Sequence, residues 1–174
     1  MVNFLILGAE SGMQRVFTTA GWVKVDADVK NTVLHGILGS LSKEAYLTMP
    51  MSQLYLFGRA QDYGWAHAEP ISVVASRNHL RLWKAPFTIH GETAWVGAAT
   101  HDIGFEKDQR NGKVTHKIDP GVDGERENIG TSLEKSGKVK SMYYYLPPNP
   151  VQDARNATGG GYHSDGRILV IVLQ

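Results

Sequence analysis

Two short stretches, Leu80-Arg81-Leu82-Trp83 and Ala94-Trp95-Val96-Gly97-Ala98, decide the fold. Each is a brief apolar run of the kind that forms β-strands. Three further runs of this kind, residues 54–57, 71–74 and 114–118, surround them. A series of strands that follow one another along the chain predicts a sheet of mainly antiparallel neighbours in the middle of the protein.

Helical patterns flank this region. Residues 4–7 are a short apolar strand, and apolar residues follow at helical spacing over residues 13–20 and again over 33–41. Asp119-Pro120 predicts the start of a third helix, with Asp as N-cap and Pro in the first turn, and the helix should end near Gly137. The continuous apolar run at residues 167–173 is typical of a central strand.

The order of these elements predicts an α/β (α+β) fold. We expect a single domain over residues 1–174, with a mixed, mostly antiparallel β-sheet and about three helices packed on it. The net charge of +1 gives no electrostatic footprint for nucleic acid. Because the chain has no cysteine, thiol catalysis, disulfides and thiolate metal sites are excluded.

The dipeptide Asn111-Gly112 predicts a two-residue hairpin turn, which would place His116 opposite Lys107. Side chains alternate along a strand, so His116 should lie on the apolar face of this hairpin. The same alternation puts His101 on that face, but about 20 Å further along the strand. We therefore expect His101 and His116 not to share a metal ion, unless Gly104 breaks the strand.

A first polar cluster is expected on the neighbouring strand, where His79, Arg81 and Trp83 share one face. If Trp83 pairs with Trp95, His79 lies close to His101, with Asp102 beside it. The candidate ligand-binding residues are His79, Arg81 and His101, forming a ligand pocket or an acid–base site. The alternative is a set of hydrogen-bonded histidines at the end of a sheet, with Arg81 stacked on a tryptophan.

A second cluster is expected at the start of the third helix. Arg126 lies on the apolar stripe of this helix, and a guanidinium that faces a core needs a carboxylate, which Asp123 can supply from the same face. The candidate catalytic residues are His116, Asp119, Asp123, Glu125 and Arg126. The first three are also candidate ligands for a divalent metal cofactor, and Arg126 suits phosphoryl oxygens. The alternative is a buried ion-pair network that locks the helix to the sheet.

Several short motifs, in this order, resemble the LssY C-terminal domain family over nearly the whole chain. The motifs are Leu54–Asp62, Arg77–Trp83, Trp95–Ala99, Thr115–Asp119 and Val122–Arg126. The resemblance implies an uncharacterised bacterial domain, often found C-terminal to membrane regions of the DedA-like or lipid-phosphatase type. It therefore implies a membrane protein partner, or a fused membrane region in relatives, and supplies no assigned catalytic residues.

Together these features predict a binding or accessory module for a small anionic ligand or a membrane partner protein. The alternative is a metal-assisted phosphoester hydrolase that uses His116, Asp119, Asp123 and Arg126. The sequence shows no signal peptide and no apolar run of the ~20 residues that a membrane helix needs. We therefore expect a soluble domain, cytoplasmic or peripheral to the bacterial inner membrane, with no nucleic-acid partner and an oligomeric state that the sequence leaves open.

Overall fold

The computed structural model describes the chain except for residues 26–50, 52, 68–75, 110, 113 and 157–158. Within the described residues, the main sheet has eight strands, seven of them in the order β2-β5-β6-β7-β1-β12-β9, and β8 pairs with β7. The strands of this sheet are β1 (Phe4–Leu7), β2 (Val23–Val25), β5 (Tyr63–His67), β6 (Ser76–Ile89), β7 (Glu92–Lys107), β8 (Val114–Ile118), β9 (Val139–Tyr145) and β12 (Ile168–Leu173). Two small hairpins complete the described strands: β3 (Tyr55–Leu56) with β4 (Arg59–Ala60), and β10 (Asp153–Arg155) with β11 (Gly161–His163).

The sheet is mixed and mostly antiparallel, as the sequence predicted. Strands β1 and β12 run parallel, and each of the other neighbouring pairs in this sheet is antiparallel. The C-terminal strand β12 has a neighbour on each side, so it lies inside the sheet, but only one strand from the edge. Its position explains its uninterrupted apolar sequence, because an interior strand covered on both faces has little polar surface to present.

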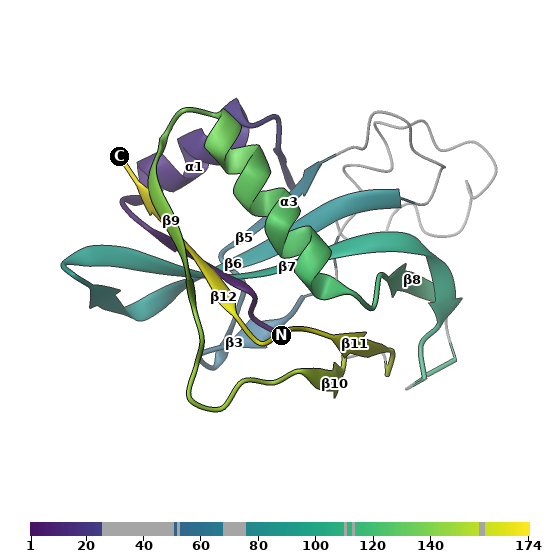
Figure 1. The fold of residues 1–174 in the computed structure, drawn as a ribbon. Coiled ribbons are helices and arrows are strands. Elements are labelled where there is room, and N and C mark those ends of the chain that lie inside the picture. The colour runs from purple at the N-terminus through teal and green to yellow at the C-terminus, as the bar shows by residue number, and fades with distance from the viewer. Residues whose placement is uncertain (26–50, 52, 68–75, 110, 113, 157–158) are drawn as a thin grey trace.

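Helices α1 (Glu10–Thr19) and α3 (Val122–Lys135) cover the same face of the sheet (Figure 1). Their apolar stripes meet the strands in one large core, in which α1 supplies Phe17 and α3 supplies Ile129 and Leu133. The described residues thus hold two helices instead of about three, and the helix expected over residues 33–41 lies outside them. No helix of the described part of the chain is long and apolar enough to cross a membrane.

The first turn of α3 differs from the prediction. The helix begins at Val122 with Gly121 as its N-cap, so Asp119 and Pro120 do not occupy the N-cap and first helical positions. The Asp119 side chain instead accepts a hydrogen bond from the Gly121 amide at 2.8 Å, which closes a short turn before the helix. The predicted end is confirmed: Gly137 follows the last turn in a left-handed conformation, with a φ of 66°.

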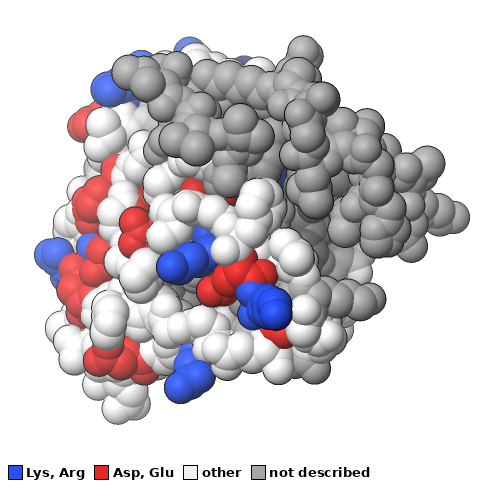
Figure 2. All heavy atoms as spheres, turned by 90° about the vertical axis from the view of Figure 1, so that its right-hand side faces the viewer, with Lys and Arg blue, Asp and Glu red and all other residues white. Residues whose placement is uncertain are grey.

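The opposite face of the sheet has a smaller apolar cluster of Leu7, Ala85, Ala94, Val96 and Val170. It is on this second face that strand β6 places Arg77, His79 and Arg81. The exposed charges seen in Figure 2 are mixed, with Lys and Arg next to Asp and Glu. The outer surface in this view thus shows charges of both signs side by side.

Candidate functional site

A one-residue difference in strand register decides which polar side chains meet. The expected pairing of Trp83 with Trp95 is wrong: Trp83 lies opposite Val96, and Arg77 lies opposite Asp102. A shift of one residue moves each side chain of a strand to the other face of its partner. Asp102 therefore lies opposite Arg77, where the expected pairing would have placed His101.

His101 consequently faces the helix-covered side of the sheet. It pairs with Asn78, and its Nε2 atom lies 2.8 Å from Ser76 Oγ. Its backbone carbonyl accepts the amide of Asp119 at 2.8 Å, which ties the segment before α3 to β7. Of the three candidate ligand-binding residues, the structure keeps His79 and Arg81 on one face of β6 and places His101 on the other.

The hairpin of β7 and β8 also differs from the prediction. Lys107 lies opposite Val114, and Phe105 lies opposite His116, so Asn111-Gly112 is not a two-residue turn between these strands. The amide of Gly112 is bonded to the Asp108 carbonyl at 2.8 Å, which closes a wider loop.

A bulge in β7 then brings His116 to Asp102. The register shifts between Asp102 and Gly104, and Gly104 has a φ of 152° that favours glycine. As a result Asp102 pairs with Ile118, on the face that carries His116. The Nδ1 atom of His116 lies 3.5 Å from Asp102 Oδ2.

These strands build a compact group that we name the Asp102 cluster, made of Arg77, His79, Arg81, Asp102 and His116. Asp102 is fully buried, and its two carboxylate oxygens face different partners. Oδ1 lies 2.8 Å from His79 Nε2, and Oδ2 lies 3.2 Å from Arg77 Nε. The side chain of His116 remains 25% exposed, so it forms the boundary between the cluster and its surroundings.

Burial shifts the pKa of several members of this cluster. It lowers the pKa of His79 to about 4 and that of Arg81 to about 10, and it also lowers the pKa of His116. Burial by itself raises the pKa of Asp102, but the charges and hydrogen bonds of His79, His116 and Arg77 outweigh it and hold this pKa at about 2. At neutral pH the cluster therefore combines two guanidinium ions, one carboxylate and two neutral imidazoles.

Two polar atoms on this face of β6 are buried and have no hydrogen-bond partner among the described residues. They are His79 Nδ1 and Trp83 Nε1. A third such atom, Trp65 Nε1, belongs to the core on the helix-covered face. Buried polar groups in native proteins are nearly all paired, with protein, water or ligand, so two unpaired atoms in one row of alternating residues call for an explanation.

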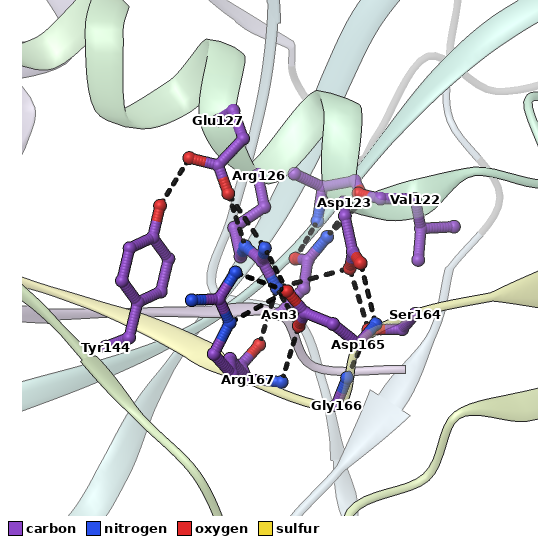
Figure 3. Close-up of polar contacts among 11 residues, drawn as sticks. Asn3, Val122, Asp123, Arg126, Glu127, Tyr144, Ser164, Asp165, Gly166 and Arg167 are labelled. Atoms are coloured by element: carbon purple, nitrogen blue, oxygen red, sulfur yellow. Dashed lines mark hydrogen bonds and ion pairs between the residues drawn. The ribbon is translucent and has the colours of Figure 1, made fainter.

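The second predicted cluster has a different character. Arg126 is 1% exposed and forms a bidentate pair with Asp165, at 2.7 and 3.0 Å (Figure 3). Its remaining donors bond Glu127, Asp123 and the carbonyl of Arg167. A guanidinium has one N–H group on Nε and two on each of its other nitrogens. Nε has one contact, Nη1 has three and Nη2 has two, so Arg126 has no donor left for a phosphoryl oxygen.

This arrangement ties three elements together. The Asp123 carboxylate on α3 accepts the Ser164 hydroxyl and the Asp165 amide, each at 2.7 Å, and so holds the turn that precedes β12. Glu127 bonds the hydroxyl of Tyr144 on β9, and the ring of Tyr144 lies against the Arg126 guanidinium, 5.2 Å from the ring centroid. The geometry is that of an ion-pair network that locks helix to sheet.

The other candidate residues of this cluster each have different partners. His116 contacts Asp102, Asp119 caps a turn, and Glu125 is buried with Asn128 as a hydrogen-bond partner at 3.3 Å. Among the described residues, no group of three or more His, Asp or Glu side chains is arranged to hold a metal ion. The three candidate metal ligands, His116, Asp119 and Asp123, therefore do not form a metal-binding group in the part of the chain that the structure describes.

Sequence reasoning missed the carboxylate that matters most to Arg126. It identified Asp123, three residues away, whereas the bidentate partner is Asp165, 39 residues away. The signal was present in the turn sequence Ser164-Asp165-Gly166, which offers a carboxylate and backbone amides just before a buried strand. The position of Asp102 as the centre of the first cluster was likewise beyond the sequence.

Comparison with known proteins gives one family match. A family model described as LssY C-terminus matches residues 1–168. None of the curated proteins and none of the solved structures matches the chain.

Proposed function

The chain belongs to the LssY C-terminus family, and from that premise we propose that it is a binding module for a small anionic ligand, held at the Asp102 cluster. The observation that carries this proposal is the row Arg77, His79, Arg81 and Trp83 on one face of β6. These side chains alternate along the strand, each is at most 7% exposed, and two of them carry the unpartnered polar atoms.

The charge of the row favours an anion. Arg77 and Arg81 are both buried, and Arg77 and His79 contact the carboxylate of Asp102. A guanidinium presents several N–H donors in a fixed plane, an arrangement that matches the oxygens of an oxyanion. A small anion bound beside these two guanidinium groups would interact favourably with their positive charge.

The Arg126 network supports this assignment by its completeness. Its carboxylates and its guanidinium are paired with one another, and a paired network of this kind has a structural role. Metal-assisted hydrolysis through His116, Asp119, Asp123 and Arg126 therefore gains no support from the geometry. The membrane protein partner that the resemblance implies stays a prediction.

Isothermal titration of the intact chain with inorganic phosphate and with sulfate, at pH 7 and low salt, tests the proposal. We expect saturable binding of at least one anion. The variant Arg81→Gln should bind roughly ten- to a hundredfold more weakly, because a charge-assisted hydrogen bond is lost. Arg155→Gln is the matched control, since Arg155 is an exposed arginine on β10. A folded wild-type chain that binds neither anion would refute the proposal.

A further inference from the structure

We propose that the ligand of the Asp102 cluster is an oxyanion that carries a proton of its own, of which hydrogen phosphate is the simplest, and that His79 Nδ1 accepts the hydrogen bond from that proton. This inference rests on the proposed function and specifies the class of its ligand. It follows from the hydrogen-bonding capacity of one buried imidazole.

The contacts of His79 fix which of its ring nitrogens carries hydrogen. Its Nε2 atom lies 2.8 Å from Asp102 Oδ1, and an ionised carboxylate only accepts hydrogen bonds. Nε2 must therefore be the donor, and Thr100 Oγ1, at 3.1 Å, lies beside the same atom. In a neutral imidazole the other nitrogen then has a lone pair and no hydrogen, so Nδ1 is an acceptor.

The imidazole is neutral at pH 7, in keeping with the low pKa that burial gives it. Its acceptor atom Nδ1 is buried and has no hydrogen-bond partner among the described residues. A partner for this atom has to bring a hydrogen, which a fully deprotonated anion cannot do.

The neighbours of His79 supply hydrogen-bond donors, whereas its Nδ1 atom is an acceptor. Arg77 and Arg81 stand two residues to either side on the same face of β6, which places their attachment points roughly 7 Å away. Guanidinium groups only donate hydrogen bonds, so they suit the charged oxygens of the ligand. An oxyanion with charged oxygens and one hydroxyl would thus match the two positive charges and the acceptor together. A site with a buried acceptor discriminates against an anion that lacks the hydrogen.

Phosphate and sulfate test whether the ligand must carry a hydrogen, because both anions are tetrahedral and of similar size but differ in protonation. At pH 7 phosphate carries at least one proton, whereas sulfate carries none. We expect the wild-type chain to bind phosphate roughly ten- to a hundredfold more tightly than sulfate in isothermal titration, the range that follows when a buried polar group is left unpaired.

The variant His79→Gln tests the role of the acceptor. A glutamine amide nitrogen can reach the Nε2 position and keep the donor to Asp102, but it has no acceptor at the Nδ1 position. We expect His79→Gln to lose the preference for phosphate over sulfate. A variant that folds and keeps the wild-type preference would overturn the inference.

A measurement on the wild-type chain keeps the inference testable if the variant does not fold. Nitrogen-15 NMR of labelled histidines reports which ring nitrogen is protonated. We expect an unprotonated Nδ1 in His79 whose resonance shifts on addition of phosphate and stays in place with sulfate. Equal affinity for the two anions would refute the inference and leave the proposed function standing, whereas binding of neither would refute the proposed function itself.

Discussion

Replacement of Asp165 by alanine should destabilise the protein by about 3 kcal/mol. The change removes both oxygens of the bidentate pair with Arg126, which lie at 2.7 and 3.0 Å, and leaves a guanidinium that is 1% exposed. Breaking a buried ion pair by removal of one partner typically costs about 3–5 kcal/mol. We take the lower end, because the Asp165 side chain is 34% exposed and Arg126 keeps Glu127 and Asp123 as partners.

Urea unfolding followed by circular dichroism measures this loss directly, and thermal melting should show a fall of roughly 6–12 °C. Asp153→Ala is the matched control. Asp153 also forms an ion pair with a neighbour, His163, but these side chains are 72% and 77% exposed, so the variant should stay within about 0.5 kcal/mol of the wild type. A loss in Asp165→Ala below about 1 kcal/mol, or equal to that of the control, would show that Arg126 does not depend on this pair.

The pH dependence of the same difference has a definite sign. The hydrogen bonds from Arg126 hold the pKa of Asp165 well below its ordinary value of 3.8. A carboxylate with a lowered pKa in the folded state stabilises that state above its unfolded pKa, and the contribution disappears as acid protonates it. The difference in unfolding free energy between wild type and Asp165→Ala should therefore be constant from pH 5 to pH 8 and shrink below about pH 4.

Two further predictions concern the sheet. Between pH 7 and pH 4 the wild type should lose about 3 kcal/mol of unfolding free energy relative to His79→Gln. The reason is that the native pKa of His79, about 4, lies below its ordinary value of 6.5, so acid protonates this residue in the unfolded chain first. An equal change in the unfolding free energy of the two proteins over this pH range, measured by urea unfolding, would contradict the prediction. Gly97→Ala should cost at least about 2 kcal/mol, since a Cβ there would stand 2.1 Å from the Phe4 ring, whereas Gly124→Ala on α3 meets open space and should stabilise by about 0.5–1 kcal/mol. Equal melting temperatures for these two glycine variants would refute the packing argument.

The positions of the central strands β6 and β7 and of the two described helices followed from local sequence patterns. The runs at 80–83 and 94–98 lie inside β6 and β7, and the apolar stripe of residues 122–133 lies on α3. Periodicity predicts such elements because one face of each must be buried, so apolar residues recur at regular intervals along the sequence. The sequence also predicted that Arg126 needs a carboxylate partner, because this residue lies on the buried stripe of its helix.

Only the tertiary structure decided which polar residues meet. The bidentate partner of Arg126 comes from a turn 39 residues away, and no local pattern couples the two positions. The candidate site depends on a register one residue from the expected pairing and on a bulge beside Gly104, which together replace His101 by Asp102 as the neighbour of His79. Strand register is set by the packing of whole strands against distant partners, and because side chains alternate, one residue of difference determines which groups form the site.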